Sequence, residues 1–234
     1  MDRVSVVILA GGQGSRLGQA GRPKALVELC GRPLISYVLD VASSLSRDLV
    51  VVVSSEEQAG ALESSGILAD TRLVLDDASL GPACPLLGLV SGLSAVRESV
   101  ALALACDMPL ASRSVLAFLA DVISYMNAAV PSWPNGYVEP LQAAYRVRAA
   151  VEVGRRVLEA GESPSLRAFL RELRRVRYIS TAVLEQLDPG LSTFLNVNAP
   201  ADLRRAEAIL RAKRRCARGS LRAGGAKRSS ERVP

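Results

Sequence analysis

Short runs of β-branched and other apolar residues alternate, in the first half of the chain, with longer stretches of helical hydrophobic spacing. An apolar run without interposed polar residues predicts a strand buried on both faces of a sheet. Such runs occupy residues 4–10, 49–54, 71–75 and 100–105, and helical patterns occupy residues 33–45, 56–66, 85–96 and 112–126. Alternating strands and helices form right-handed crossovers between parallel strands. The pattern therefore predicts an α/β fold with a doubly wound, mostly parallel sheet that has helices on both faces.

The pattern becomes less regular after residue 130. Residues 131–137 (PSWPNGY) predict a turn-rich excursion, and residues 139–147 predict a strand that can return antiparallel to the others. The remaining predicted elements are helices over 148–160 and 164–174, a strand over 176–180, and a terminal helix over 199–212. Pro200 suits the first turn of this last helix.

Basic residues are concentrated at the end of the chain. Residues 211–234 contain nine Lys and Arg and one Glu, a net charge of +8, whereas the whole chain of 234 residues carries +6. Residues 1–210 are therefore slightly acidic, and the basic character belongs to a segment with few large apolar residues. We predict one folded domain over residues 1–210 and a basic, disordered tail over residues 211–234. A nucleic-acid-binding arm is the alternative to a solvated tail, and the solvated tail is favoured.

Composition excludes several classes of protein. The 49% of hydrophobic residues is too high for a disordered chain, and no apolar run approaches the ~18 residues that span a bilayer. Residues 4–10 are too short for a signal-peptide core, so a soluble, cytoplasmic protein without a membrane partner is expected. The four cysteines form no paired motif and the chain has no His. These absences argue against a zinc site and exclude catalysis by an imidazole.

The loop after the first predicted strand is the most informative stretch. Residues 9–26 (LAGGQGSRLGQAGRPKAL) open with four Gly within eight residues and continue with Arg16 and Lys24. Glycines let backbone N–H groups approach phosphate oxygens closely. Arg16 can contact such oxygens as a fork, and Lys24 can act on them as a point charge. The loop predicts a triphosphate site, although its spacing matches neither G-x-G-x-x-G nor the Walker pattern, and a merely flexible loop is the alternative.

Four motifs in this order resemble one family, the molybdenum cofactor guanylyltransferases, which are nucleotidyltransferases with a Rossmann-like fold. The first is the loop, in which Leu9-Ala10-Gly11-Gly12, Ser15-Arg16-Leu17-Gly18 and Lys24 are similar to the family's L-A-G-G-x-x-x-R-M-G-x-x-K. The others are Asp77 with Pro85-Leu86-Leu87-Gly88, then Cys106-Asp107-Met108-Pro109-Leu110, and finally Phe194-Leu195-Asn196-Val197-Asn198-Ala199-Pro200. The resemblance extends from Leu9 to about Leu203.

This resemblance implies a role for each matching position. Arg16, Lys24 and Asp107 are expected to be catalytic, with Asp107 as the ligand of Mg²⁺, because a carboxylate at the end of a buried strand suits a hard divalent cation. The residues expected to bind the nucleotide are Leu9, Ala10, Gly11, Gly12, Lys24, Ser54, Asp77, Gly88, Asn196 and Asn198. Asp107 could instead be a cap or turn residue, and the two Asn could be turn formers. Asp76 precedes Asp77, so either of them could face the base or ribose, and Ser54 stands where the family has Asn.

The implied reaction transfers GMP from GTP to the phosphate of molybdopterin and releases pyrophosphate. A phosphate monoester is already ionised at neutral pH, so the reaction needs no general base. Cys84 stands where the family commonly has Gly near the pterin, and residues 24–35 also resemble adenosylcobinamide-phosphate guanylyltransferase, which makes cobinamide phosphate the alternative acceptor. Sugar-1-phosphate nucleotidyltransferases share the loop but carry an extra domain. A nucleotide-binding regulator without catalysis is the alternative of a different class, and nucleic acid is a disfavoured partner.

Overall fold

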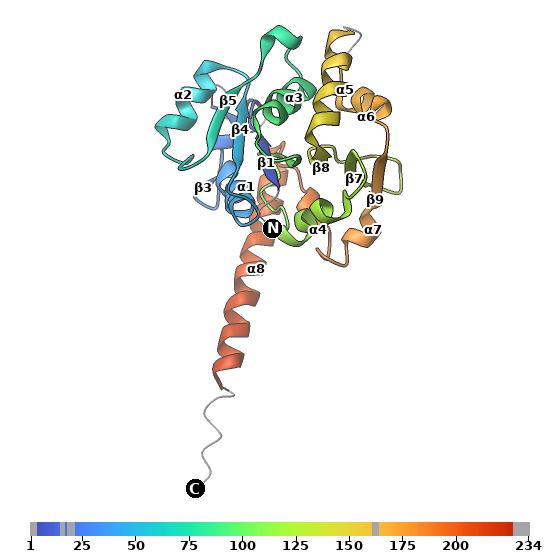
Figure 1. Ribbon diagram of the computed structural model, residues 1–234. Coiled ribbons are helices and arrows are strands. Elements are labelled where there is room, and N and C mark those ends of the chain that lie inside the picture. Colours follow the sequence, from blue (N-terminus) through green and yellow to red (C-terminus); the bar gives the residue numbers. More distant parts are fainter. Residues whose placement is uncertain (1–3, 15–16, 18–21, 161–163, 227–234) are drawn as a thin grey trace.

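A seven-stranded sheet forms the centre of the protein (Figure 1). The computed structural model describes residues 4–14, 17, 22–160 and 164–226. The strands follow the order β5-β4-β1-β6-β8-β7-β9, and β8 runs antiparallel to both of its neighbours while the other adjacent pairs are parallel. The predicted mostly parallel sheet with one antiparallel strand is therefore confirmed. The strands are β1 (Ser5–Leu9), β4 (Leu49–Val53), β5 (Arg72–Leu75), β6 (Val100–Ala105), β7 (Ala128–Ser132), β8 (Gln142–Arg146) and β9 (Val176–Ser180).

Helices cover both faces of this sheet, as the sequence predicted. The helices are α1 (Leu34–Ser43), α2 (Glu56–Ser64), α3 (Pro85–Ala95), α4 (Arg113–Val122), α5 (Val147–Glu159), α6 (Leu166–Glu172), α7 (Thr181–Leu184) and α8 (Pro200–Ala226). One core cluster joins the sheet to α1, α2 and α4, and a second joins it to α3, α5 and α6. None of the described helices is both long and apolar enough to cross a lipid bilayer.

Two glycines let α3 pack closely against its neighbours. A Cβ at Gly92 would lie 2.3 Å from Val7 on β1 and 2.8 Å from Val52 on β4. A Cβ at Gly154 on α5 would lie 2.4 Å from Val90 on α3. Since real Cβ atoms do not approach so closely, the absence of these side chains fixes the position of α3 over the sheet. The beginning of α3 is thereby held at the carboxyl edge of β1, β4 and β5.

Three strands, β2, β3 and β7, were not predicted from the sequence. A small hairpin joins β2 (Glu28–Leu29) to β3 (Arg32–Pro33), with Cys30 and Gly31 between them at positive φ angles of 51° and 75°. This is the backbone of a tight two-residue hairpin turn. Strand β7 contains Pro131, which argues against a central strand because proline has no N–H. The β7–β8 pairing ends at Ala129, so the missing N–H falls beyond that ladder.

Helix α8 is longer than predicted and projects away from the rest of the domain (Figure 1). It reaches Ala226, whereas the sequence predicted a helix that ends at residue 212 and a disordered tail over residues 211–234. Ala, Leu, Arg and Lys are strong helix formers, so this segment can continue a helix that the domain has already started. The start of α8 packs through Ala206 against the β2–β3 hairpin and α1. Residues 227–234 lie outside the described part of the chain.

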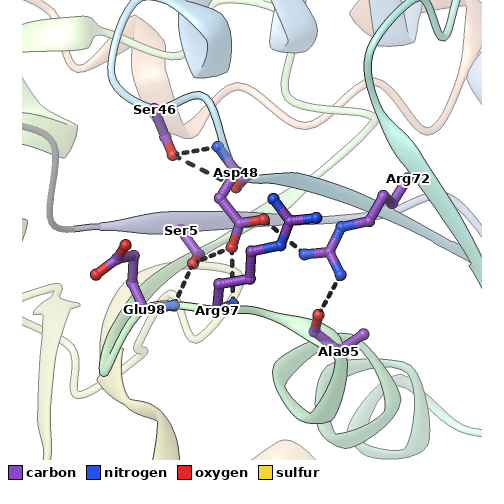
Figure 2. A network of polar contacts seen from close by, with 7 residues as sticks. All are labelled: Ser5, Ser46, Asp48, Arg72, Ala95, Arg97 and Glu98. Atoms are coloured by element: carbon purple, nitrogen blue, oxygen red, sulfur yellow. Dashed lines mark hydrogen bonds and ion pairs between the residues drawn. The ribbon is translucent and has the colours of Figure 1, made fainter.

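A polar network joins three strands at the amino edge of the sheet, opposite the edge where the predicted ligand lies (Figure 2). Asp48 is its centre. Its Oδ1 accepts a hydrogen bond from Arg72 Nη2 at 2.6 Å, and its Oδ2 accepts from Ser5 Oγ and from the Arg97 backbone N–H, the latter at 2.8 Å. Arg72 also donates to Ala95 O at 2.6 Å. Burial acts to raise the pKa of Asp48, but these hydrogen bonds and the Arg72 charge outweigh it and lower the pKa.

Replacement of Asp48 by Asn is expected to lower the free energy of unfolding by about 2–3 kcal/mol at pH 7, because the NH2 group that replaces one oxygen cannot accept a hydrogen bond and the attraction to Arg72 is lost. A group with a lowered folded-state pKa stabilises the fold above its unfolded-state pKa and loses this effect as the pH falls through the folded-state value. The difference between wild type and Asp48→Asn should therefore shrink below about pH 4 in urea unfolding. Asp70→Asn, at an exposed position, is the control and should change stability by less than about 0.5 kcal/mol. A pH-independent difference would contradict the assignment.

Candidate active site

The main cavity lies at the carboxyl edge of the sheet, where the strand order reverses. In the sheet, β4 and β5 lie on one side of β1. Strand β6, which comes later in the chain, lies on the other side of β1. Open α/β sheets bind ligands at such a switch point. The cavity has a volume of about 540 Å³ and receives residues from the ends of β1, β4, β5 and β6. Its size and place suit a nucleotide-sized ligand.

Most of the predicted site residues meet in this cavity although they are far apart in the sequence. The predicted residues that line it are Leu9, Gly11, Gly12, Lys24, Ser54, Gly88, Asp107 and Asn198. Two more lining residues are Asp76, the stated alternative to Asp77, and Cys84, the position expected near the acceptor. Lining residues to which the sequence assigned no role are Gln13, Leu17, Val52, Ala83, Pro85, Ala105, Cys106 and Leu141. Arg16 lies outside the described residues. The other predicted residues, Ala10, Asp77 and Asn196, are described but do not line the cavity.

Lys24 is the buried cation of the site. It lies in a short 3₁₀ turn, Lys24–Leu26, and only 8% of its surface is exposed. Its Nζ donates hydrogen bonds to Asp107 Oδ2 and, at 2.6 Å, to Asn198 Oδ1. Asp107 follows β6, and Asn198 precedes α8, so three distant segments meet at one ammonium group. A buried ion pair with a further hydrogen bond is rigid, which pre-organises the charge of Lys24.

The backbone around Asp107 is also held firmly. Val197 N donates to Asp107 O at 2.8 Å, which ties the Asn196–Asn198 segment to the end of β6. Asp202 Oδ2 accepts from the backbone N–H groups of Asn198 at 3.0 Å and Ala199 at 2.8 Å, so it caps the start of α8. The segment that carries the two Asn is therefore fixed from both sides.

Two side-chain oxygens near this junction are buried and have no hydrogen-bond partner among the described residues. They are Asp107 Oδ1 and Asn196 Oδ1. Buried polar atoms are normally paired, so the unpaired oxygen of Asp107, which lines the cavity, is available to a ligand or cation. No group of three or more Cys, Asp or Glu that could hold a metal is present in the described part of the chain. One carboxylate with amide oxygens fits Mg²⁺, which takes few protein ligands and completes its shell with substrate phosphates and water.

Asp76, rather than its neighbour Asp77, faces the cavity. Asp76 continues the β5 ladder, with its N–H donating to Val53 O at 2.9 Å, and its Oδ1 is buried and without a partner among the described residues. A Cβ at Gly88 of α3 would lie 3.3 Å from this oxygen, so the motif's aspartate and glycine are neighbours in space. Asp77 is exposed and accepts from Ser79 N at 3.2 Å and Ser79 Oγ at 2.6 Å. Of the two alternatives that the sequence left open, Asp76 faces the cavity and Asp77 lies outside it.

Burial raises the pKa of Asp76 to about 6 from the ordinary 3.8. A carboxyl with a raised folded-state pKa favours the fold at low pH, and this contribution is lost as the pH rises through 6. At pH 8, Asp76→Asn is therefore expected to raise the melting temperature by a few degrees, because the buried charge is removed. The gain should disappear below about pH 4, where the wild-type carboxyl is neutral. Thermal unfolding between pH 4 and 8 measures this.

The control for this prediction is the adjacent Asp77→Asn. It removes a charge of the same kind from an exposed turn where the hydrogen bonds of Ser79 lower the pKa of Asp77, so it should give no gain in melting temperature at pH 8. If Asp76→Asn lowered the melting temperature at pH 8, the account of Asp76 as an uncompensated buried charge would be wrong.

The other predicted residues take structural places. Ala10 is buried in the core below the loop. Ser54 lines the cavity, but its Oγ lies 3.0 Å from Gly11 O and 3.0 Å from Gln58 Oε1, so its hydroxyl is engaged with protein groups. Cys84 is a free thiol at the N-cap position of α3, in the cavity wall. Its side chain makes no capping hydrogen bond to this helix. The backbone N–H groups at the amino end of α3 are therefore free of a described side-chain cap.

This fold and site are those of a nucleotidyltransferase. Solved structures of similar proteins have the same fold. A crystal structure of the molybdopterin-guanine dinucleotide biosynthesis protein A from Archaeoglobus fulgidus is 30% identical and superposes with a TM-score of 0.74 over 89% of this chain and 99% of that one. The 4-diphosphocytidyl-2C-methyl-D-erythritol synthase of Anaerococcus prevotii shares the fold at a TM-score of 0.66 and 15% identity, covering 90% of this chain and 96% of that one.

Sequence relatives lead to the same family. A molybdenum cofactor guanylyltransferase from Desulfosudis oleivorans is 34% identical over 215 residues, which cover 92% of this chain and 99% of the relative. A probable molybdenum cofactor guanylyltransferase from Thermococcus gammatolerans is 32% identical over 199 residues, 84% of this chain and 95% of the relative. The family model of the MobA-like NTP transferase domain matches residues 6–176. The chain belongs to the MobA-like NTP transferase family, and the resemblance seen in the sequence is confirmed.

Proposed function

We propose that this chain is a Mg²⁺-dependent guanylyltransferase that moves GMP from GTP to the phosphate of molybdopterin and releases pyrophosphate. The observation that carries the proposal is the junction of Lys24, Asp107 and Asn198 at the carboxyl edge of the sheet. It combines a fixed cation, a carboxylate with one unpaired oxygen, and a cavity of about 540 Å³ in one place. The names of the relatives support guanosine as the nucleoside and molybdopterin as the acceptor.

The lining of the cavity favours one orientation of the nucleotide. Its base and ribose belong at the side of Leu9, Asp76 and Gly88, where apolar walls meet one carboxylate that can accept hydrogen bonds. Its phosphates belong at the side of Gly12 and Lys24, where N–H groups and the ammonium group stabilise negative charge. Arg16 follows the same loop in sequence and is proposed to join Lys24 on the phosphates.

The donor set supports a Mg²⁺ ion held by Asp107, with the oxygens of Asn196 and Asn198 as neutral neighbours. When bound, such an ion would act as a Lewis acid and would neutralise negative charge that develops during transfer. The coarser statement, a divalent metal, leaves Mn²⁺ as an alternative, and a comparison of Mg²⁺ with Mn²⁺ in the same reaction separates the two. The unpaired Asp107 Oδ1 is the group on which this assignment depends.

The residues of the chain supply position and electrostatics rather than proton transfer. The phosphate of the acceptor is ionised at neutral pH and can attack the α-phosphorus of GTP once the two are held in line. Lys24 and the N–H groups of the glycine loop stabilise the charge on the α-phosphoryl oxygens and on the departing pyrophosphate. A reaction that needs no proton transfer by the protein suits a chain that has no His.

The acceptor is tested directly by pyrophosphate release. Each of GTP, ATP, CTP and UTP is offered with Mg²⁺ and either molybdopterin or cobinamide phosphate. Turnover with GTP and molybdopterin alone is the expected result. Turnover with cobinamide phosphate would move the acceptor to the alternative, and the Cys84 position at the cavity wall would be the first residue to exchange for Gly. Binding of GTP without release for either acceptor would favour a regulator.

We also propose the cytoplasm as the place of this reaction. Cys30, Cys84 and Cys106 are free thiols, as is usual for proteins of a reducing compartment. Fractionation of cells that express a tagged full chain tests this, and recovery in a membrane or secreted fraction would contradict it.

A further inference from the structure

Gln58 is a buried side chain that reaches from α2 to the base of the glycine loop. It is the third residue of α2 and only 1% of its surface is exposed. Its Nε2 donates to Gly11 O at 3.0 Å, and its Oε1 accepts from Ser54 N at 2.9 Å. The carboxamide thus connects the loop after β1 to the end of β4, and its bond to Gly11 spans 47 residues of sequence.

The local sequence accounts for only one of these two contacts. Ser55 caps α2 by accepting from Gln58 N at 3.3 Å, and Ser55-x-x-Gln58 has the spacing of a capping box. In a capping box the Gln oxygen accepts from the backbone N–H of the cap residue, and here Oε1 accepts from Ser54, the residue just before the cap. The donation from Nε2 to Gly11 O contributes nothing to the helix. It acts on the loop alone.

This contact fixes the direction of the Gly11–Gly12 peptide. The described residues contain no cis peptide bond, so in this peptide the carbonyl of Gly11 and the N–H of Gly12 point in opposite directions. Gly11 lies so close to Ser54 that a Cβ would be 3.1 Å from Ser54 Cβ, and its carbonyl points to Ser54 Oγ and Gln58 Nε2. The N–H of Gly12 is therefore directed away from α2, and Gly12 itself lines the cavity.

We propose that Gln58 is a positioning residue for nucleotide binding, because it holds the Gly11–Gly12 peptide with the Gly12 N–H directed toward an oxygen of the bound nucleotide. The inference rests on the proposed function, since it requires a nucleotide in this cavity. Without the Nε2 donor, the Gly11 carbonyl keeps only the Ser54 hydroxyl, and the acceptor at position 58 competes for that proton. The peptide is then held less firmly and can rotate, which would present a carbonyl oxygen to the ligand in place of an N–H. An anionic ligand would then be repelled where it had been bound.

The variant Gln58→Glu separates the two contacts. A carboxylate keeps the acceptor for Ser54 N and remains suitable for the capping box, but it has no donor for Gly11 O. We expect the dissociation constant for GTP to rise about 10-fold or more and kcat/KM for GTP to fall about 10- to 100-fold at pH 8, the range for the loss of one aligned donor. The melting temperature should stay within a few degrees of wild type. Isothermal titration with GTP alone measures the first effect independently of the acceptor.

Lower pH should partly restore the GTP affinity of Gln58→Glu. A protonated Glu carries one O–H donor and can again donate to Gly11 O, and burial favours this neutral form. At each pH, the GTP affinity of Gln58→Glu is divided by the GTP affinity of the wild type. This ratio should therefore increase from pH 8 to pH 6. Gln58→Leu has neither donor nor acceptor and should show the loss of affinity without any restoration.

Glu63→Gln is the matched control. Glu63 is exposed on the same helix, and the exchange is the reverse of the one at Gln58, so GTP affinity should be unchanged. A Gln58→Glu variant that binds GTP as wild type does, or that loses affinity without restoration at pH 6, would overturn the assignment. A wild-type chain that binds none of the four nucleotides would contradict the proposed function itself, and this result appears in the wild-type measurement alone.

Discussion

Replacement of Asp107 by Asn is expected to lower kcat for pyrophosphate release on the order of 10³-fold in the presence of Mg²⁺. Asn has the same shape, but it removes the negative charge that pairs with Lys24 and the carboxylate oxygen that has no partner among the described residues. Among the described residues Asp107 is the one carboxylate that pairs with Lys24, so no described group replaces its charge there. Steady-state kinetics with GTP and the acceptor measure the loss, and circular dichroism establishes that the variant is folded.

A second readout separates a metal ligand from a partner of Lys24. Mn²⁺ titration in the presence of GTP, followed by electron paramagnetic resonance, should show weaker metal binding for Asp107→Asn. Asp121→Asn provides the control, because Asp121 is exposed on α4 at a distance from the main cavity. Unchanged turnover of Asp107→Asn would rule out the metal assignment, and unchanged Mn²⁺ binding with lost turnover would restrict Asp107 to the ion pair.

Lys24→Met is expected to lower kcat/KM for GTP about 10²-fold. Methionine keeps most of the length and apolar character of the stem but removes the ammonium group that stabilises the phosphate charge. The ammonium group also neutralises Asp107 and donates to Asn198 at 2.6 Å. The loss should therefore appear in kcat as well as in KM, because a charge that develops in the transition state is no longer stabilised.

Lys213→Met is a control with the same chemical change. Lys213 lies on α8, where its Nζ donates to Ser192 Oγ at 2.9 Å and lies 3.9 Å from Asp188 Oδ1. This substitution should leave kcat/KM unchanged, although it removes contacts between α8 and the domain. Equal activity of Lys24→Met and wild type would exclude Lys24 from the phosphate site.

The buried strands were predictable because each reads as an apolar run without polar interruption. Leu49–Val53 is buried at every position, and Val100–Ala105 at all but its first. The small hairpin of β2 and β3 gave no such signal, since each of its strands has only two residues. Strand β7 was missed for a different reason: Pro131 argues against a strand unless the end of the neighbouring ladder is known.

The site was predictable to the extent that its residues follow strands. Asp107 was expected near the loop of Lys24 because the carboxyl ends of parallel strands converge, whereas Asn198 follows no strand and was expected there only from the family resemblance. The choice between Asp76 and Asp77 depends on how far the β5 ladder continues, and Asp76 N still donates to Val53 O. That bond is a tertiary contact that no local pattern encodes. Gln58 was not predicted at all, because its short motif indicates only a helix cap and its second contact is 47 residues away.

The free protein keeps several polar groups in positions that cost stability. Asp76 Oδ1, Asp107 Oδ1 and Asn196 Oδ1 are all buried without a partner among the described residues. Each such group is unfavourable in the absence of a ligand, and each would be satisfied by a donor or a cation. The expected gain in melting temperature for Asp76→Asn at pH 8 should therefore accompany a loss of GTP affinity. This opposition between stability and binding is typical of functional sites.

The central claim, transfer of a nucleotidyl group to a phosphate at this cavity, is tested most directly by the fate of labelled phosphorus. The full chain is incubated with Mg²⁺, molybdopterin and GTP that carries ³²P at either the α or the γ position. The account predicts that the α label appears in a product linked to the acceptor and the γ label in pyrophosphate. An α label that remains in GTP, GDP or free GMP, or a γ label that appears on the acceptor, would contradict it.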